Sequence, residues 1–155
     1  EGFRVVGVDD VLGGITAPEG TLGTHVPDAE AERDIRRGVE VVRALGAADV
    51  GQAAIVQDGI VLGVEAVEGT DALLQRCIGL RREGPGGVLV KLSKPGQEKR
   101  ADLPTIGSDT VARAKEAGLR GIAIEAGLTL VIASDAVIEA ADAAGLFVIG
   151  LSASW

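Results

Sequence analysis

The chain has 155 residues, a formal net charge of -8 and a pI near 4.6, and 46% of its residues are hydrophobic. Nonspecific nucleic-acid binding requires a basic face, which a chain of this charge does not offer. The aromatic residues are two phenylalanines and one tryptophan, too few for the stacking platforms of single-strand-binding proteins. We therefore expect no nucleic-acid partner, and any phosphate site must be local.

The length suits one compact domain that buries roughly 70% of its unfolded surface. Cys77 is the only cysteine, which excludes an internal disulfide and a Cys-rich zinc site and fits a reducing compartment such as the cytoplasm. No apolar run approaches the roughly 18 residues that indicate a membrane-spanning helix. Because the sequence contains no methionine, we expect Glu1 to follow a missing N-terminal domain. Residues 1–27 would then be the tail of that domain and a linker.

The first half of the chain predicts a strand over 1–10, a Gly/Pro/Thr-rich connector over 13–27 and a helix from Asp28. Apolar residues recur at three- and four-residue steps in this helix until Gly46. Two β-rich runs, 53–56 and 60–64, are joined through Asp58-Gly59, a dipeptide typical of tight hairpin turns. A helix capped by Thr70 should follow.

The second half alternates strands and helices. We expect strands over 88–92, 121–125, 129–132 and 146–151, a helix over 108–117 capped by Ser108, and a helix over 136–144 capped by Asp135. This alternation predicts an α/β layered domain over 28–155, with a mixed, largely parallel sheet flanked by helices.

Two segments carry most of the chemistry-bearing side chains. The segment 91–102 holds four cations (Lys91, Lys94, Lys99, Arg100) and two acids (Glu98, Asp102), a local charge of 4 - 2 = +2. It lies at a strand-to-helix junction, where open α/β sheets collect ligands, and Pro95 and Pro104 stiffen its ends. A small anion is the ligand that this composition favours.

The second segment, 65–71, gathers Glu65, Glu68 and Asp71. An ordinary helix start explains part of it, since Thr70 can be an N-cap and Asp71 a first-turn acid. The added Glu65 favours a site, because clustered acids repel one another unless a cation lies among them. The lysines of segment 91–102 can supply that cation. The common glycine-rich nucleotide fingerprints are absent from the sequence.

Several motifs in one order then resemble a known family. They are Gly-Gln-Ala at 51–53, Val-Glu-Ala-Val-Glu-Gly-Thr-Asp at 64–71 with Arg76, Val-Leu-Val-Lys at 88–91, Lys-Pro-Gly-Gln at 94–97, Arg100, Asp-Leu-Pro-Thr-Ile-Gly at 102–107 and Ala-Gly-Leu-Arg-Gly-Ile at 117–122. Together they resemble the catalytic C-terminal domain of the LpxI family of UDP-2,3-diacylglucosamine pyrophosphatases of Gram-negative bacteria. The resemblance implies hydrolysis of UDP-2,3-diacylglucosamine to UMP and 2,3-diacylglucosamine 1-phosphate (lipid X) in lipid A synthesis, with Mg²⁺ as cofactor.

The family also implies an N-terminal domain that helps to enclose the substrate. From this resemblance we expect the catalytic residues to be Asp102, Asp71 and Lys91. The expected metal ligands are Asp102, Asp71 and Glu65. We expect the substrate to be bound by Thr70, Lys94, Gln97, Arg100, Thr105 and Gln52. The protein would be cytoplasmic, a homodimer, and in peripheral contact with the inner membrane through its lipid substrate.

Two readings from other classes stay open. The same cations could serve a non-catalytic module that binds a sugar nucleotide or a lipid phosphate. The Ala/Gly-rich helices could instead form an oligomerisation domain that packs against a second copy of itself. Charge alone does not separate these readings from an enzyme.

Overall fold

The computed structural model describes residues 14–96 and 103–155, so the strand expected over 1–10 lies outside the described residues. The main sheet has the order β2–β9–β7–β5–β3–β4. Its strands are β2 (Gly20–Leu22), β9 (Phe147–Leu151), β7 (Gly121–Glu125), β5 (Val88–Lys91), β3 (Ala53–Gln57) and β4 (Ile60–Val64). The pairs β5–β7 and β7–β9 are parallel, and the other neighbours are antiparallel. The predicted α/β class with a mixed sheet is confirmed, and within this main sheet the parallel pairs involve β5, β7 and β9.

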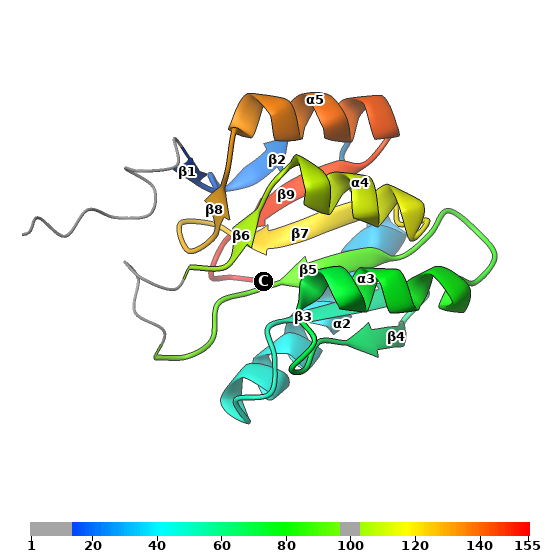
Figure 1. Cartoon of the computed structure of the whole chain (residues 1–155), viewed down its shortest axis with the longest axis vertical. Coiled ribbons are helices and arrows are strands. Elements are labelled where there is room, and N and C mark those ends of the chain that lie inside the picture. The colour runs from blue at the N-terminus through cyan, green and yellow to red at the C-terminus, as the bar shows by residue number, and fades with distance from the viewer. Residues whose placement is uncertain (1–13, 97–102) are drawn as a thin grey trace, which may run out of the picture.

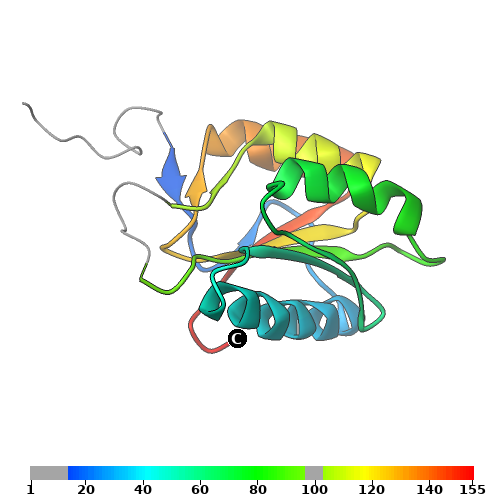
Figure 2. The ribbon, with the colours of Figure 1, turned by 60° about the horizontal axis from the view of Figure 1, so that its bottom comes forward.

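Helices cover both faces of this sheet, which gives three layers (Figures 1 and 2). Helix α2 (Ala29–Ala47) packs on one face. Helices α3 (Thr70–Cys77), α4 (Ser108–Glu116) and α5 (Ser134–Ala144) cover the other, and the 3-10 turn η1 (Ile78–Leu80) follows α3. No helix in the described part of the chain combines the length and apolarity needed to cross a membrane.

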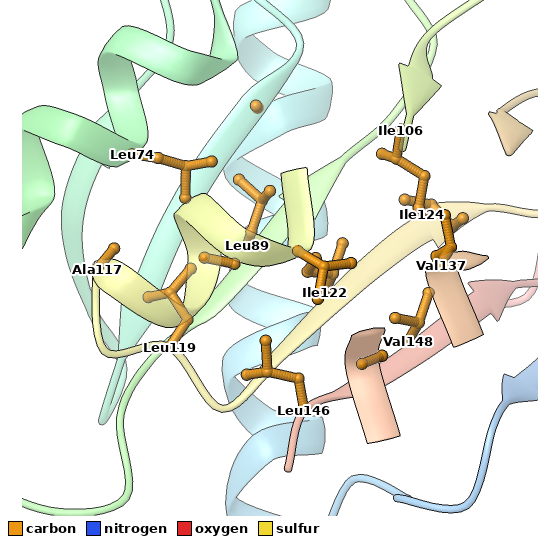
Figure 3. Close-up of a cluster of buried hydrophobic side chains, with 14 of the residues drawn as sticks. Leu74, Leu89, Ile106, Ala117, Leu119, Ile122, Ile124, Val137, Leu146 and Val148 are labelled. Carbon is orange, nitrogen blue, oxygen red and sulfur yellow. The ribbon is translucent and has the colours of Figure 1, made fainter. Parts of the chain in front are cut away.

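The two-residue period of the strands divides the core between the two faces. Leu89, Ile122 and Val148 point toward α3, α4 and α5 (Figure 3). Val88, Val90 and Ala123 belong to the cluster beneath α2. Because both faces of the central strands are covered, β5 and β7 read as nearly continuous apolar runs.

A small second sheet lies beyond the carboxyl ends of the parallel strands (Figure 1). It consists of β1 (Ile15–Thr16), β8 (Leu130–Val131) and β6 (Thr105–Ile106), with β8 in the middle. The strand expected over 129–132 is therefore shorter than predicted and belongs to this sheet. The connector expected over 13–27 contains two strands, because β1 joins the small sheet and β2 pairs with β9 of the main sheet.

Local signals identified the turns better than the helix starts. The hairpin between β3 and β4 is confirmed, with φ of 53° at Asp58 and 75° at Gly59, and Asp28 caps α2 by accepting from the amide of Ala31. The other three predicted caps are wrong. The N-cap residues are Gly69, Gly107 and Ala133, so Thr70, Ser108 and Asp135 lie inside the helices that they were expected to cap.

Candidate active site

Strand register brings distant parts of the sequence to one edge of the main sheet. Ala53, at the start of β3, pairs with Lys91 at the end of β5, and Val64, at the end of β4, pairs with Ala54. Gln52, Glu65 and Lys91 therefore meet although they are far apart in the sequence. This is the edge at which the parallel strands end, the usual ligand position in open α/β sheets.

Glu65 is the acid at the centre of this edge. It is only 6% exposed, and its amide continues the β-ladder by donating to the carbonyl of Ala53. Its carboxylate accepts from the Thr70 hydroxyl at 2.6 Å and from the main-chain amide of Gln52 at 3.3 Å. The Thr70 side chain thus bonds to Glu65 and does not cap α3.

Lys91 is a buried cation, 8% exposed, whose ammonium donates to the carbonyl of Thr105 at 3.0 Å. Burial lowers the pKa of Lys91, and the negative charges of Glu65 and Asp71 partly oppose that shift. The acid-rich and base-rich segments of the sequence are therefore close enough for their charges to interact.

Asp71, in the first turn of α3, is the accessible acid of the site. Its side chain is 66% exposed and pairs with Arg113 of α4 at 3.5 Å. A first-turn carboxylate is favoured by the partial positive charge of the helix N-terminus. Asp71 can therefore meet a ligand that approaches from solvent, whereas Glu65 is enclosed.

The chain that leaves β5 is held by contacts that sequence reasoning missed. Glu125, at the end of β7, accepts from both the amide and the hydroxyl of Ser93, at 2.9 and 2.5 Å. Lys94 pairs with Asp49 at 3.2 Å. The only available signal for Glu125 was an acid at the end of an apolar strand.

A cavity of about 370 Å³ adjoins this edge. Its walls come from the segment between α2 and β3, the turn after β4 and the segment after β5. The lining residues are Asp49, Val50, Gly51, Gln52, Glu65, Ala66, Lys94, Pro95 and Gly96. The Oε1 atom of Gln52 is buried and has no hydrogen-bond partner among the described residues.

The predicted site residues fall into three groups. Gln52, Glu65, Thr70, Lys91 and Thr105 are linked by the contacts above, with Asp71 beside them. Lys94 lies across the cavity, next to Asp49. Gln97, Arg100 and Asp102 lie outside the described residues.

The predicted Mg²⁺ can be compared with the donors present. Among residues 14–96 and 103–155, no group of three or more His, Cys, Asp or Glu side chains could hold a metal ion. Proteins commonly bind Mg²⁺ through one or two carboxylates together with substrate phosphates and water, not through a complete protein cage. Asp71, an exposed hard oxygen donor, fits that kind of binding. Both oxygens of Glu65 already accept hydrogen bonds.

Comparison with known proteins identifies the family of this chain. A family model described as the LpxI C-terminal domain matches residues 18–149. The chain is also 50% identical, over 157 aligned positions, to the UDP-2,3-diacylglucosamine pyrophosphatase LpxI of Caulobacter vibrioides. The alignment covers 97% of this chain and 56% of that protein, so the chain spans little more than half the length of this relative. The chain belongs to the LpxI C-terminal domain family.

Proposed function

We propose that this chain forms the catalytic part of a protein that hydrolyses UDP-2,3-diacylglucosamine to UMP and 2,3-diacylglucosamine 1-phosphate (lipid X) in lipid A synthesis. The relative's name and 50% identity support the substrate. The observation that carries the proposal is the buried Lys91, which donates to the Thr105 carbonyl at the carboxyl edge of the sheet and interacts electrostatically with Glu65 and Asp71. A buried cation at a ligand edge suits the concentrated negative charge of a diphosphate.

The reaction places clear demands on the site. Water attacks one phosphorus of the diphosphate, the bond from that phosphorus to the bridging oxygen breaks, and the bridging oxygen leaves with the other phosphate. The attacking water releases a proton to the solvent, and negative charge accumulates on the phosphate oxygens. Fixed cations and amide donors stabilise this charge best when they are already in place.

The residues of this chain can meet these demands. We assign Lys91, Lys94 and Arg100 to the phosphates and Asp102 to the orientation of the attacking water. The first-turn amides of α3, which begins at Thr70, have no acceptors within the helix and can donate to phosphate oxygens. Gln52, Gln97 and Thr105 are proposed to contact the remainder of the substrate.

We further propose Mg²⁺ as the cofactor, held by Asp71 and Asp102. When bound, the ion neutralises charge on phosphate oxygens. We also keep as proposals an N-terminal domain that helps to enclose the substrate, a homodimer, and peripheral contact with the inner membrane through the lipid chains.

The test is release of UMP from UDP-2,3-diacylglucosamine by the full-length protein. We expect turnover that EDTA abolishes and added Mg²⁺ restores. Asp102→Ala should reduce the rate to background while leaving the thermal melt unchanged. Glu139→Gln, an exposed acid on α5, controls for the loss of one negative charge and should keep the normal rate.

Each result has a distinct meaning. Near-normal turnover by Asp102→Ala would remove Asp102 from the chemistry. Tight binding of lipid X by the wild-type protein, with no UMP released at any Mg²⁺ concentration, would show that the protein is a non-catalytic binding module and not an enzyme.

A further inference from the structure

Glu65 connects three segments of the site through one carboxylate. One oxygen accepts from the main-chain amide of Gln52, just before β3, and the other accepts from the Thr70 hydroxyl, at the start of α3. The buried Lys91, at the end of β5, lies within electrostatic reach of the same group. All three partners are residues proposed to act on the substrate.

The surroundings of Glu65 leave this carboxylate little freedom. Glu65 is 6% exposed, and its main-chain amide donates a hydrogen bond to the carbonyl of Ala53. The backbone of Gly51 lies so close to the Glu65 carbonyl that a Cβ atom at Gly51 would overlap with it. A rigid group with fixed hydrogen bonds is suited to holding neighbouring side chains in position.

The charge balance also favours this role over direct metal binding. A buried carboxylate needs compensation, and Glu65 receives it from two donors and from the nearby Lys91 ammonium. A divalent ion at Glu65 would lie close to the buried ammonium and would be repelled by it. The Asp71 carboxylate, in contrast, is exposed to solvent.

We propose that Glu65 is a positioning residue of the pyrophosphatase site, which sets Gln52, Thr70 and Lys91 in the geometry that the substrate requires, and that it does not bind the metal. The inference rests on the proposed function. It assigns a different role to Glu65 from the metal-ligand role that the family resemblance implied.

The test uses Glu65→Gln in the full-length protein, with Glu68→Gln as the matched control. Glu68 lies three residues away in the same turn, but its carboxylate pairs with Arg76 at 2.6 Å. For Glu65→Gln we expect kcat/KM to fall roughly 10- to 100-fold, since a displaced substrate-positioning group costs about this much. Glu68→Gln should keep the wild-type value.

Metal binding separates the two roles without relying on turnover. We measure Mn²⁺ binding by electron paramagnetic resonance. The affinity of Glu65→Gln should equal that of the wild-type protein within about twofold, because the substitution removes no metal ligand. A tenfold or greater loss of Mn²⁺ affinity would overturn the inference and make Glu65 a ligand. Normal kcat/KM in Glu65→Gln would overturn it as well.

A second pair of variants tests the same link from the Thr70 side. Thr70→Val removes the hydroxyl that bonds to Glu65, and Thr70→Ser retains it. We expect Thr70→Val to lose activity and Thr70→Ser to keep it, and Glu65→Gln to cost less in the Thr70→Val background than alone. Fully additive losses would overturn the inference. If Glu65→Gln does not fold, Glu65→Asp, which keeps the charge and shortens the side chain, replaces it in the activity and Mn²⁺ measurements, with the same expected outcomes. Absence of wild-type turnover would refute the proposed function instead.

Discussion

Lys91 is a cation in a strand whose other residues are all fully buried and apolar. Val88, Leu89 and Val90 are 0% exposed, and Lys91 is 8% exposed. Removing an ammonium group from water is costly unless it gains partners. The Thr105 carbonyl and the charges of Glu65 and Asp71 offset part of that cost. The fold therefore holds this cation at some expense of stability, as is common for functional groups.

The cost of burying Lys91 predicts a specific pH dependence. In the unfolded chain the lysine titrates near 10.5, and burial lowers its pKa in the folded protein. Between these two values the unfolded state binds more protons than the folded state, so folding becomes more favourable as the pH rises. The free energy of unfolding of the wild type, minus that of Lys91→Met, should therefore increase as the pH rises toward 10.5.

Urea unfolding at a series of pH values, in EDTA, measures this difference. The comparison is made above about pH 7, where carboxylates are ionised in both proteins. Lys115→Met, in an exposed part of α4, controls for the loss of one positive charge. A difference that stays flat or decreases up to pH 10.5 would show that Lys91 carries no burial cost.

At the residue scale, the sequence predicts which charged groups belong to the site but not the hydrogen bonds that these groups form. The acidic cluster predicts a nearby cation. That prediction is confirmed, since Lys91 interacts with Glu65 and Asp71. Thr70 was assigned as a cap because a threonine before a helix usually is one. Its bond to Glu65 depends on tertiary placement, which no local pattern contains.

At the scale of elements, helix α2 depends on a glycine for its approach to the sheet. A Cβ atom at Gly38 would lie 2.9 Å from Val90 Cβ and closer still to one of its methyl groups. Val90 is on β5, in the middle of the sheet, and is 0% exposed, so it has no room to move away. The contact between α2 and β5 is thus set by the absence of a side chain at Gly38.

Gly38→Ala should consequently destabilise the protein even though alanine is the better helix former. Overpacking of a core typically costs 1–3 kcal/mol, while the gain in helix propensity is about 1 kcal/mol. We expect a net loss of up to about 2 kcal/mol in urea unfolding. Gly79→Ala is the matched control, because a Cβ atom there would meet nothing within 4 Å. A Gly38→Ala protein as stable as the wild type would mean that α2 shifts freely.

Elements with strong local signals were the ones that the sequence predicted well. The Asp58-Gly59 turn and the apolar stripe of α2 are encoded within a few residues. The short strands β1, β2 and β6, which the sequence did not predict, exist because their main chains pair with the distant strands β8 and β9. In β2 only Leu22 is buried, so the sequence has no alternation of apolar and polar residues that would predict this strand. A Gly/Pro/Thr-rich stretch then reads as a linker.

At the scale of the whole molecule, the described residues form two separate apolar clusters, one on each face of the main sheet. Gly38 and Val90 belong to the α2 side, whereas Cys77 is buried on the side of α3, next to Gly63 of β4. The central strands contribute alternate residues to both clusters. If the sheet transmits stability between its faces, the two layers should unfold together.

Alkylation of Cys77, the only cysteine in the chain, can test this cooperativity. The thiol is 1% exposed and burial raises its pKa, so the folded protein should react slowly at neutral pH and chiefly through opening. If opening is global, Gly38→Ala should accelerate labelling by the factor that its stability loss dictates, about tenfold for each 1.4 kcal/mol. Gly79→Ala should leave the rate unchanged. An unaltered labelling rate in a destabilised Gly38→Ala protein would show instead that the α3 layer opens on its own, without unfolding of the α2 face.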